Sequence, residues 1–347
     1  MARIVTLKDI ANELGTSIVT VSNALSGKKG VSEAVRTQVI EKARELGYDN
    51  AKQNKIPQGK VTIGVIVSEQ YIGIGTSFYW TMYQQAVWAA STHKALTTLE
   101  IISTDQEKKL EPPRLAADEA IDGLIVIGKL EKIYLDCILK VLKVPVVLLD
   151  FRCEESGCSS VMSNNYIGMY KMTRYLLKKG HRSIGYVGEV ETNENLCDRY
   201  FGYRKVMEEW GVPVNQEWVI ADPQVVSQKA AISLPKTLPT AFVCCNDYVA
   251  GFLYDRLSQL GYRVPEDISL VGYDNYLYGH SLAKKLTTYN VDMKEMAAVA
   301  VKMLLKKANG KSDYYKIVYL DSQIVERDSV KSITCLLYTS PSPRDCS

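Results

Sequence analysis

Residues 6–25 read TLKDIANELGTSIVTVSNAL and predict two short helices joined by a tight turn. Thr6 can cap the first helix, because Asp9 follows three residues later in the capping-box position. Gly15 can end this helix, since glycine adopts turn conformations that other residues resist. Two helices at this spacing are typical of a helix-turn-helix.

A third helix completes the predicted head. Thr16 or Ser17 can cap the second helix, and the third begins at Ser32. Its apolar residues recur at helical spacing and form one stripe: Val35, Val39, Ala43 and Leu46. The small Ala11 lets the first two helices cross closely. We therefore expect three helices around a miniature core.

The outward face of the second helix indicates contact with DNA. Ile18 and Val19 fit thymine methyl groups, and Asn23 can pair with adenine. Hydroxyl side chains and helix amino termini suit phosphates, and two lysines add charge. The alternative is a structural cap whose Ile18 and Val19 pack on a larger domain. The candidate DNA-binding residues are Thr6, Thr16, Ser17, Ile18, Val19, Thr20, Ser22, Asn23, Lys28 and Lys29.

Positive charge is concentrated in this head. Residues 1–60 hold ten Lys and Arg against six Asp and Glu, a net charge of +4. The whole chain has 42 basic and 39 acidic residues, a net charge of +3, so the rest carries −1. A basic head on a nearly neutral body fits a polyanion partner for the head, although a solvated basic face would look the same.

Composition excludes several other classes of protein. A chain of 347 residues with 46% hydrophobic content predicts two or three soluble domains. No apolar run approaches the roughly 18–20 residues that a bilayer crossing requires, so we expect no membrane protein. The amino terminus lacks the features of an export signal, which favours the cytoplasm. Eight cysteines without a C-x-x-C pair and three histidines supply a metal site poorly, so we expect reduced thiols and no cofactor.

The remainder alternates strand-like and helical patterns and predicts parallel sheets. A first set of strands spans 61–67, 96–102, 123–128 and 144–149, with helices near 77–93 and 131–142. A second set spans 183–188, 217–221, 241–245 and 268–272, with helices near 165–179, 198–210, 223–234 and 248–260. We therefore expect an α/β body of two doubly wound lobes joined by crossing strands around one cleft.

Polar side chains follow the predicted strands at the edge where open α/β sheets bind ligands. The candidate effector-binding residues are Phe78, Tyr79, Trp80, Asp150, Arg199, Asn246, Asp247 and Asp274. Carboxylates and a guanidinium can bind hydroxyl groups, and aromatic rings can stack on sugar C–H faces, which predicts a polyol or sugar. Asp198 and Asp247 could instead cap the helices that they precede.

The head and the body both resemble the lactose/galactose repressor (LacI/GalR) family. The matching motifs lie at 5–11, 15–25, 31–32 and 43–48, and at 180–184, 198–203, 246–247, 271–274 and 286–288. The resemblance implies a helix-turn-helix on a bilobed, periplasmic-binding-protein-like body. It implies a homodimer on pseudo-palindromic double-stranded operator DNA, and effector contacts at the positions of Asp150, Arg199, Asn246 and Asp274. Departures from the family pattern at Asn164 and at the aromatic trio leave the identity of the effector open.

The resemblance also implies the domain boundaries. Residues 1–48 are the expected DNA-binding domain, 49–60 the hinge, and 61–332 the effector-binding and dimerisation domain. The composition changes abruptly in residues 333–347, which indicates a non-native tail. The hinge lacks the family's Pro-Asn-x-x-Ala-Arg-x-Leu pattern, and Pro57 disfavours helix. A flexible tether and a hinge helix with Ile56 as a minor-groove wedge both remain open.

Enzymes have little support in this sequence. It has no Gly-x-Ser-x-Gly elbow, no phosphate-binding Gly-x-x-x-x-Gly-Lys loop and no His-Glu-x-x-His pair. A periplasmic transport receptor would share the body but need an export signal and no head. We expect a transcriptional regulator, most simply a repressor of carbohydrate-utilisation genes controlled by a sugar or related metabolite, which could act as inducer or co-repressor.

Overall fold

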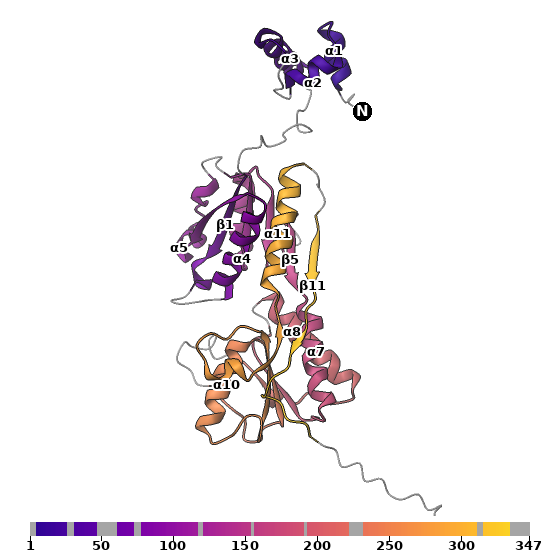
Figure 1. Cartoon of the computed structure of the whole chain (residues 1–347). Helices are drawn as coiled ribbons and strands as arrows, with labels where there is room; N and C mark the ends of the chain where they lie inside the picture. The colour runs from indigo at the N-terminus through magenta and orange to yellow at the C-terminus, as the bar shows by residue number, and fades with distance from the viewer. Residues whose placement is uncertain are drawn as a thin grey trace, which may run out of the picture. The chain divides into compact units, whose positions relative to one another are not determined.

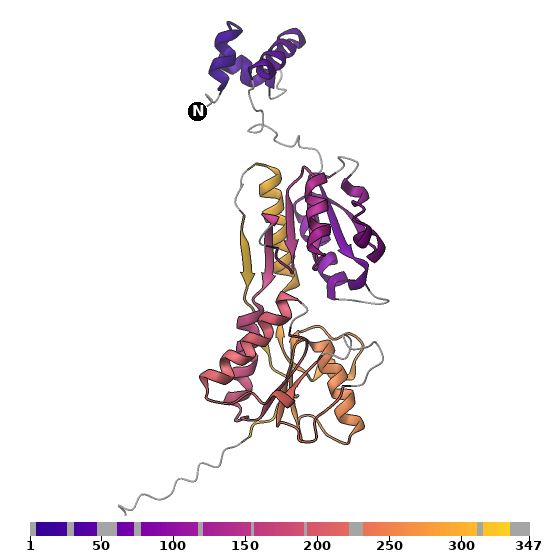
Figure 2. The same ribbon diagram turned by 180° about the vertical axis from the view of Figure 1, so that it is seen from behind.

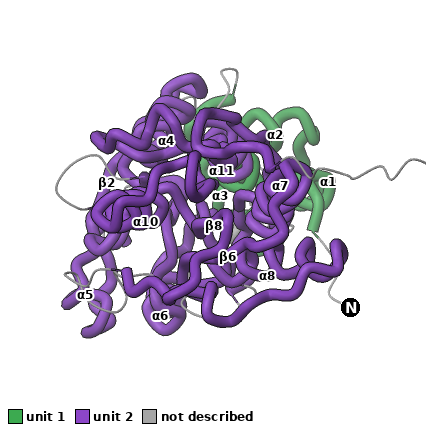
Figure 3. The backbone as a smooth tube through the Cα atoms, turned by 90° about the horizontal axis from the view of Figure 1, so that it is seen from below, with its two compact units in different colours: residues 1–61, 305–313 green, residues 62–304, 314–347 purple. Residues whose placement is uncertain are grey.

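The computed structural model describes residues 5–25, 31–46, 61–72, 78–116, 121–153, 156–190, 193–221, 232–310 and 315–333. The chain divides into two compact units, which Figure 3 distinguishes by colour: residues 1–61 with 305–313, and residues 62–304 with 314–347. The expected hinge at 49–60 lies outside the described residues, as does all of the expected tail except Ile333.

The first unit holds the three predicted helices, α1 (Leu7–Glu13), α2 (Ile18–Leu25) and α3 (Glu33–Glu45). The expected capping box is present at the start of α1, where the Thr6 backbone N–H donates to the Asp9 carboxylate at 2.7 Å. Gly15 lies between α1 and α2 with a φ of +60°, which explains the need for glycine in this turn. The helix-turn-helix is confirmed.

Local side chains also fix the second and third helices. Ser17, rather than Thr16, caps α2, because its hydroxyl accepts a hydrogen bond from the Thr20 backbone N–H at 3.0 Å. Ser32 plays the same part for α3. The three helices enclose one small core of buried residues: Ile10, Ala11, Val21, Ala24, Val39 and Ala43. The predicted Val35 and Leu46 pack against its margin.

The second unit contains two six-stranded sheets. The first has the order β11-β5-β4-β3-β1-β2 and consists of β1 (Thr62–Ser68), β2 (Leu96–Ile102), β3 (Gly123–Ile127), β4 (Val146–Leu149), β5 (Ser159–Ser163) and β11 (Ile317–Leu320). The second has the order β12-β10-β9-β8-β6-β7 and consists of β6 (Ile184–Val187), β7 (Val219–Ile220), β8 (Ala241–Cys244), β9 (Ser269–Asp274), β10 (Thr287–Asn290) and β12 (Ile324–Val325). The neighbours pair in parallel, and β12 pairs antiparallel with β10.

Helices pack on both sheets, and Figures 1 and 2 show the result as two lobes. The α-helices are α4 (Phe78–Thr92), α5 (Thr104–Lys109), α6 (Lys132–Val141), α7 (Asn165–Lys178), α8 (Glu194–Glu209), α10 (Asp247–Gln259) and α11 (Met293–Ala308). Short 3-10 turns are η2 (Glu69–Tyr71), η3 (Arg114–Ala116), η5 (Gln216–Trp218) and η6 (Ser281–Lys284). The predicted α/β class with two doubly wound lobes is confirmed.

The chain crosses between the lobes after β5, after β10 and after β11. Helix α11 returns to the first lobe, where it lies beside β5 and β11 in Figure 1 and packs Leu304 against Gly123 of β3. The sequence prediction missed β5, β10 and β11. In β5 and β10, serine and threonine fill five of the nine positions and interrupt the apolar run expected of a buried strand. These crossings bring carboxyl ends of strands from both sheets to one place.

One predicted helix boundary was wrong. Helix α8 begins at Glu194, because the Asn193 side chain caps it by accepting a hydrogen bond from the Leu196 backbone N–H at 2.9 Å. The expected start was Asp198, one turn later. Of the predicted helix at 223–234, residues 223–231 lie outside the described part, and 232–234 are not helical. No helix within the described ranges has the length and apolarity to cross a bilayer.

Candidate functional site

The outer surface of α2 exposes two adjacent apolar side chains. Ile18 is 46% exposed and Val19 is 66% exposed, whereas Val21 and Ala24 of the same helix are buried in the head core. Ser22 and the predicted Asn23 are half-buried beside them. Helix α2 therefore presents an apolar edge where its neighbours α1 and α3 present mainly polar residues.

The predicted phosphate contacts lie around this edge. The Thr6 hydroxyl donates to the Asp9 carboxylate at 2.6 Å, and the hydroxyls of Ser17 and Thr20 share a hydrogen bond of 2.8 Å. These hydroxyls therefore serve the local structure and keep further lone pairs for other donors. Thr16 is half-buried, and the predicted Lys28 and Lys29 lie outside the described residues.

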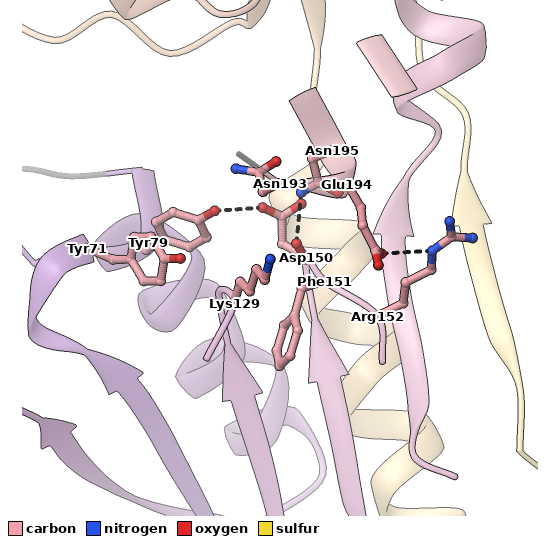
Figure 4. Close-up of a pocket in the computed structure, with 9 residues that line it drawn as sticks. All are labelled: Tyr71, Tyr79, Lys129, Asp150, Phe151, Arg152, Asn193, Glu194 and Asn195. Atoms are coloured by element: carbon pink, nitrogen blue, oxygen red, sulfur yellow. Dashed lines mark hydrogen bonds and ion pairs between the residues drawn. The ribbon is translucent and has the colours of Figure 1, made fainter. Parts of the chain in front are cut away.

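A pocket lies between the two lobes of the second unit (Figure 4). It encloses an empty volume of about 310 Å³, part of it open to solvent. Its lining residues come from both lobes: Tyr71, Tyr79, Lys129, Asp150, Phe151, Arg152, Asn193, Glu194 and Asn195. Of the predicted effector residues, Tyr79 and Asp150 line it directly.

Asp150 follows β4 and is only 4% exposed. Its φ of +66° is unusual for a residue other than glycine and marks a constrained turn. The Tyr79 hydroxyl donates to Oδ2 at 3.1 Å, whereas Oδ1 has no hydrogen-bond partner among the described residues. Burial raises the pKa of Asp150 to about 7, although the nearby Arg199 lowers it.

Arg199 of α8 is the buried cation of the site, at 5% exposure. Its Nε donates to Asn165 Oδ1 and its Nη1 to the Cys245 carbonyl, both at 2.8 Å. Its Nη2 forms an ion pair with Asp274 Oδ1 at 3.1 Å. The guanidinium also lies over the Tyr273 ring, 3.8 Å from its centroid. These contacts fix the position of the guanidinium.

Asp274 is the last residue of β9 and resembles Asp150 in backbone and charge. Its φ is +104°, and burial raises its pKa to about 6 while Arg199 lowers it. The negative charge of Asp274 also contributes to the raised pKa of Asp150. Three of the predicted residues, one from the first lobe and two from the second, thus form one buried charged cluster.

Asn246 and Asp247 are engaged within the second lobe. Asn246 caps α10 by accepting a hydrogen bond from the Val249 backbone N–H at 2.8 Å. The Asp247 carboxylate accepts from the Thr288 hydroxyl at 2.6 Å and from the Tyr276 backbone N–H at 2.8 Å. Burial raises the pKa of Asp247 to about 8. Neither residue lines the pocket in Figure 4.

The other two predicted aromatic residues lie near the pocket without lining it. The Phe78 ring meets the Tyr276 ring of the second lobe edge-on, with centroids 5.9 Å apart. The Thr81 hydroxyl donates to the Tyr276 hydroxyl at 3.3 Å. Trp80 packs against Tyr83 on its own helix, with centroids 5.3 Å apart. The Phe78 ring therefore contributes a contact between the lobes.

Sequence reasoning missed seven of the lining residues: Tyr71, Lys129, Phe151, Arg152, Asn193, Glu194 and Asn195. Tyr71 and Lys129 follow the ends of β1 and β3, so the strand-end argument that found Asp150 applies to them. The residues at 193–195 form the first turn of α8, and the late predicted start of this helix hid them.

Two polar contacts join the lobes across the pocket. Asn195 Nδ2 donates to the Asp150 carbonyl at 2.9 Å, and Arg152 forms an ion pair with Glu194 at 2.9 Å. Asn195 Oδ1, in contrast, is buried and has no hydrogen-bond partner in the part of the chain that the structure describes. Nor do the described residues contain a cluster of three His, Cys, Asp or Glu side chains that could hold a metal ion.

Comparisons with known proteins agree with this arrangement. Residues 6–50 match the bacterial regulatory proteins of the lacI family, and residues 173–330 match a periplasmic binding protein-like domain. The HTH-type transcriptional repressor PurR of Vibrio cholerae is 28% identical over 339 residues, which cover 95% of this chain and 99% of that protein.

Solved structures show the same fold. The transcriptional regulator CelR in complex with cellobiose has a TM-score of 0.66 at 21% identity, covering 94% of this chain and 99% of that one. The Lac repressor dimer bound to operator and the anti-inducer ONPF has a TM-score of 0.62 at 21% identity, covering 95% and 100%.

The two sequence matches fall on the two units of the structure. The lacI match covers the helix-turn-helix head, and the periplasmic-binding-protein-like match covers much of the bilobed body. The relatives are transcriptional regulators rather than enzymes. The resemblance found in the sequence is therefore confirmed: the chain joins a helix-turn-helix domain of the lacI family to a periplasmic binding protein-like domain.

Proposed function

We propose that this protein is a homodimeric repressor whose affinity for operator DNA is controlled by a sugar bound between its lobes. One observation supports a ligand: Asp150 Oδ1 and Asn195 Oδ1 are buried acceptors without partners among the described residues, and both residues line the pocket between the lobes. Leaving such a group unpaired costs about 1–3 kcal/mol, so a bound donor gains that free energy back.

Hydroxyl groups are the donors that suit these acceptors best. Each sugar hydroxyl donates one hydrogen bond and also accepts, so it can satisfy Asp150 or Asn195 and receive a bond from Lys129. The rings of Tyr71 and Tyr79 offer an apolar wall for the C–H face of a sugar. The CelR neighbour, solved with cellobiose, supports the same ligand class.

The head supplies the DNA contacts in this proposal. The exposed Ile18 and Val19 would meet thymine methyl groups, and Asn23 would pair with an adenine. Two heads would read the two halves of a pseudo-palindromic operator, because the symmetry of a dimer matches that of its site. The Vibrio cholerae relative is a repressor by name, which favours repression over activation.

The coupling between the two sites follows from the position of the pocket. Because both lobes contribute lining residues, a bound ligand favours one setting of the lobes. We propose the boundaries 1–48 for the DNA-binding domain, 49–60 for the hinge and 61–332 for the effector-binding and dimerisation domain. A change in lobe setting would reach the paired heads through the hinge, with a coupling of about 1–3 kcal/mol.

Two linked measurements test the proposal on the full chain. Selection from a random duplex library at moderate salt should enrich one pseudo-palindromic sequence. A thermal-shift panel of sugars and nucleosides should then identify a sugar, which should change operator affinity by roughly 5- to 150-fold. Failure to enrich any sequence would contradict DNA recognition, whereas a response to nucleosides alone would remove the sugar and keep the regulator.

A further inference from the structure

We propose that the effector is an amino sugar whose ammonium group pairs with the carboxylate of Asp150. The inference rests on the proposed function, because it names the class of sugar bound between the lobes. Figure 4 shows Asp150 in the middle of the pocket lining, between Tyr79 and the first turn of α8 at residues 193–195. The burial, the charge balance and the unpaired oxygen of this carboxylate all favour a ligand cation.

The charges around Asp150 do not balance among the described residues. The one guanidinium near it belongs to Arg199, whose Nη2 forms its ion pair with Asp274 at 3.1 Å. The other two nitrogens of this guanidinium donate to Asn165 and to the Cys245 carbonyl. Two ionised carboxylates therefore share one guanidinium, and the cluster has a net charge of −1. Such a charge in a buried place is costly unless a cation pairs with it.

The two cations that line the pocket do not supply this pairing. Arg152 forms an ion pair with Glu194 at 2.9 Å and donates to the Tyr319 hydroxyl at 2.8 Å. Lys129 lies at an exposed position, where water screens its charge. Asp150, in contrast, is only 4% exposed. A cation that enters with the ligand would complete the charge balance.

The proton affinity of Asp150 agrees with an incomplete charge balance. Burial raises the pKa of this carboxyl group to about 7, Arg199 lowers it, and the negative charge of Asp274 raises it again. The group therefore exchanges its proton near neutral pH, and a ligand cation can take the place of this proton. A neutral hydroxyl group can also bind the oxygen, but it leaves the net charge in place.

The unpaired atoms at the pocket are hydrogen-bond acceptors. Asp150 Oδ2 accepts from the Tyr79 hydroxyl at 3.1 Å, whereas Oδ1 has no partner in the described part of the chain. Asn195 Nδ2 donates to the Asp150 carbonyl at 2.9 Å, which sets the orientation of the amide and leaves its Oδ1 unpaired. An ammonium group donates three hydrogen bonds and accepts none, so it suits Asp150, and a hydroxyl group of the same sugar can serve Asn195.

Two tyrosine rings add a second attraction for a cation. Tyr71 and Tyr79 both line the pocket, and their ring centroids lie 4.6 Å apart. Burial raises the pKa of Tyr71 to about 12, so this ring is neutral at physiological pH. The faces of neutral aromatic rings attract cations, and they also pack against the C–H groups of a sugar.

Calorimetric titration of the full chain tests the inference with matched sugars. The probes are D-glucosamine, D-galactosamine and D-mannosamine, each with its N-acetyl form and with the neutral sugar D-glucose, D-galactose or D-mannose. At pH 7, one amino sugar should bind about tenfold or more tightly than both of its uncharged counterparts, because a hydrogen bond to a charged group contributes more than a neutral one.

The proton on Asp150 gives an independent measurement on the unaltered chain. At pH 6, titrations in buffers of different ionisation enthalpy should show release of up to about one proton for each amino sugar bound, because Asp150 is mostly protonated beforehand. The affinity for the amino sugar should fall by roughly tenfold or more from pH 7 to pH 5 for the same reason.

Asp150→Asn keeps the shape of the side chain and removes its charge. This variant should lose both the preference for the amino sugar and the release of the proton. Asp105→Asn, which removes an exposed carboxylate of the first lobe outside the pocket, should keep both. If Asp150→Asn fails to fold, the matched sugars and the proton release still decide the question on the unaltered chain.

Each result separates the inference from the proposed function. Equal or tighter binding of a neutral or N-acetyl sugar, or no binding of any amino sugar while another sugar binds, would overturn the amino sugar and leave the sugar-controlled regulator intact. A preference for the amino sugar that survives in Asp150→Asn would overturn the pairing with Asp150. Binding of nucleosides, with no sugar bound, would overturn the proposed function and this inference together.

Discussion

The head and the pocket depart from an ordinary protein surface in opposite directions. The head exposes Ile18 and Val19, which normally lie inside, whereas the body buries two charged residues that normally lie outside, Asp150 at the pocket and Arg199 of α8. Exposing apolar side chains and burying charged ones both cost free energy in the isolated chain, unless a binding partner contacts these groups. The proposed function accounts for both departures, because thymine methyl groups of DNA would cover the apolar side chains and the hydroxyl groups of a sugar would pair with the buried polar groups.

The two sites also differ in how the chain assembles them. The head fixes its helices through contacts three residues apart, such as Thr6 with Asp9 and Ser17 with Thr20. At the pocket, the hydrogen bond between Tyr79 and Asp150 joins side chains 71 positions apart, and beside it Arg199 donates to the Cys245 carbonyl, 46 positions away. A substitution in the head should therefore affect the stability of one helix, whereas a substitution in the pocket should affect the contacts of both lobes.

The largest expected effect separates the two sites directly. Arg199→Ala leaves the buried Asp150 and Asp274 without their cation and should lower the free energy of unfolding of the body by about 3–5 kcal/mol. It should also abolish the thermal shift caused by the effector while operator selection persists. Urea unfolding and thermal-shift assays measure these changes.

The matched control for this substitution is Arg204→Ala, at an exposed position on the same helix. It should change neither the body stability nor the ligand response by a comparable amount. A ligand-induced shift that survives in Arg199→Ala would remove Arg199 from the effector site.

A substitution in the head should have the opposite effect, changing DNA recognition and leaving effector binding intact. Asn23→Ala should relax the preference at one base pair by about 1–3 kcal/mol, because it removes a bidentate contact to a base edge, and it should leave effector binding unchanged. Competition of operator variants in fluorescence anisotropy gives this number for each position. Asn12→Ala, at an exposed position on α1, serves as the control. An unchanged base preference at every position would contradict the assigned role of Asn23.

The sequence predicted the head almost completely, because its determinants are local. Gly15, the capping box at Thr6 and the stripe through Val39 and Ala43 all lie within single helices or their ends. The fold of the body was predicted from the repeated alternation of strands and helices. Asp150 and Asp274 were found at the strand ends for the same reason.

The other residues of the pocket are placed by tertiary contacts, which the spacing of apolar residues in the sequence does not predict. Asp247 occurs at a strand end, as Asp150 does, yet its carboxylate is engaged by Thr288 from a strand that the pattern did not predict. Asn195 lines the pocket from the first turn of α8, which Asn193 starts one turn before the predicted position at Asp198. The ring of Tyr71 packs where Gly128, directly after β3, has no side chain. These contacts join segments far apart in the sequence, so they become visible only in the folded structure.

A smaller effect tests the charge buried in the pocket. Because burial raises the pKa of Asp150 to about 7, above the ordinary value of roughly 4, the folded chain keeps this proton longer than the unfolded chain. The stabilising contribution of protonation is therefore complete below about pH 4 and is lost as the pH rises to about 7. Asp150→Asn should raise the melting temperature of the ligand-free chain at pH 8 by about 5 °C, and by less at pH 5.

Scanning calorimetry at the two pH values measures this difference, with Asp328→Asn at an exposed position as control. Because Asp150 lies in the body, the effect should persist in any variant that unfolds the head alone. A gain equal at pH 5 and pH 8 would show that Asp150 is not a strained carboxylate, and the contrast between the two sites would lose its electrostatic half.

The smallest expected effect tests how tightly the lobes are joined. Tyr276→Phe removes the 3.3 Å hydrogen bond from Thr81 across the lobes but keeps the ring that meets Phe78. One neutral hydrogen bond contributes about 0.5–1.5 kcal/mol, so effector affinity measured by calorimetry should fall by roughly two- to tenfold, without any change in operator sequence preference. Tyr278→Phe, at a position 76% exposed, should leave affinity unchanged. If both substitutions act alike, the contact between Thr81 and Tyr276 does not contribute to ligand binding, and lobe closure depends on the charged cluster and the Arg152–Glu194 ion pair.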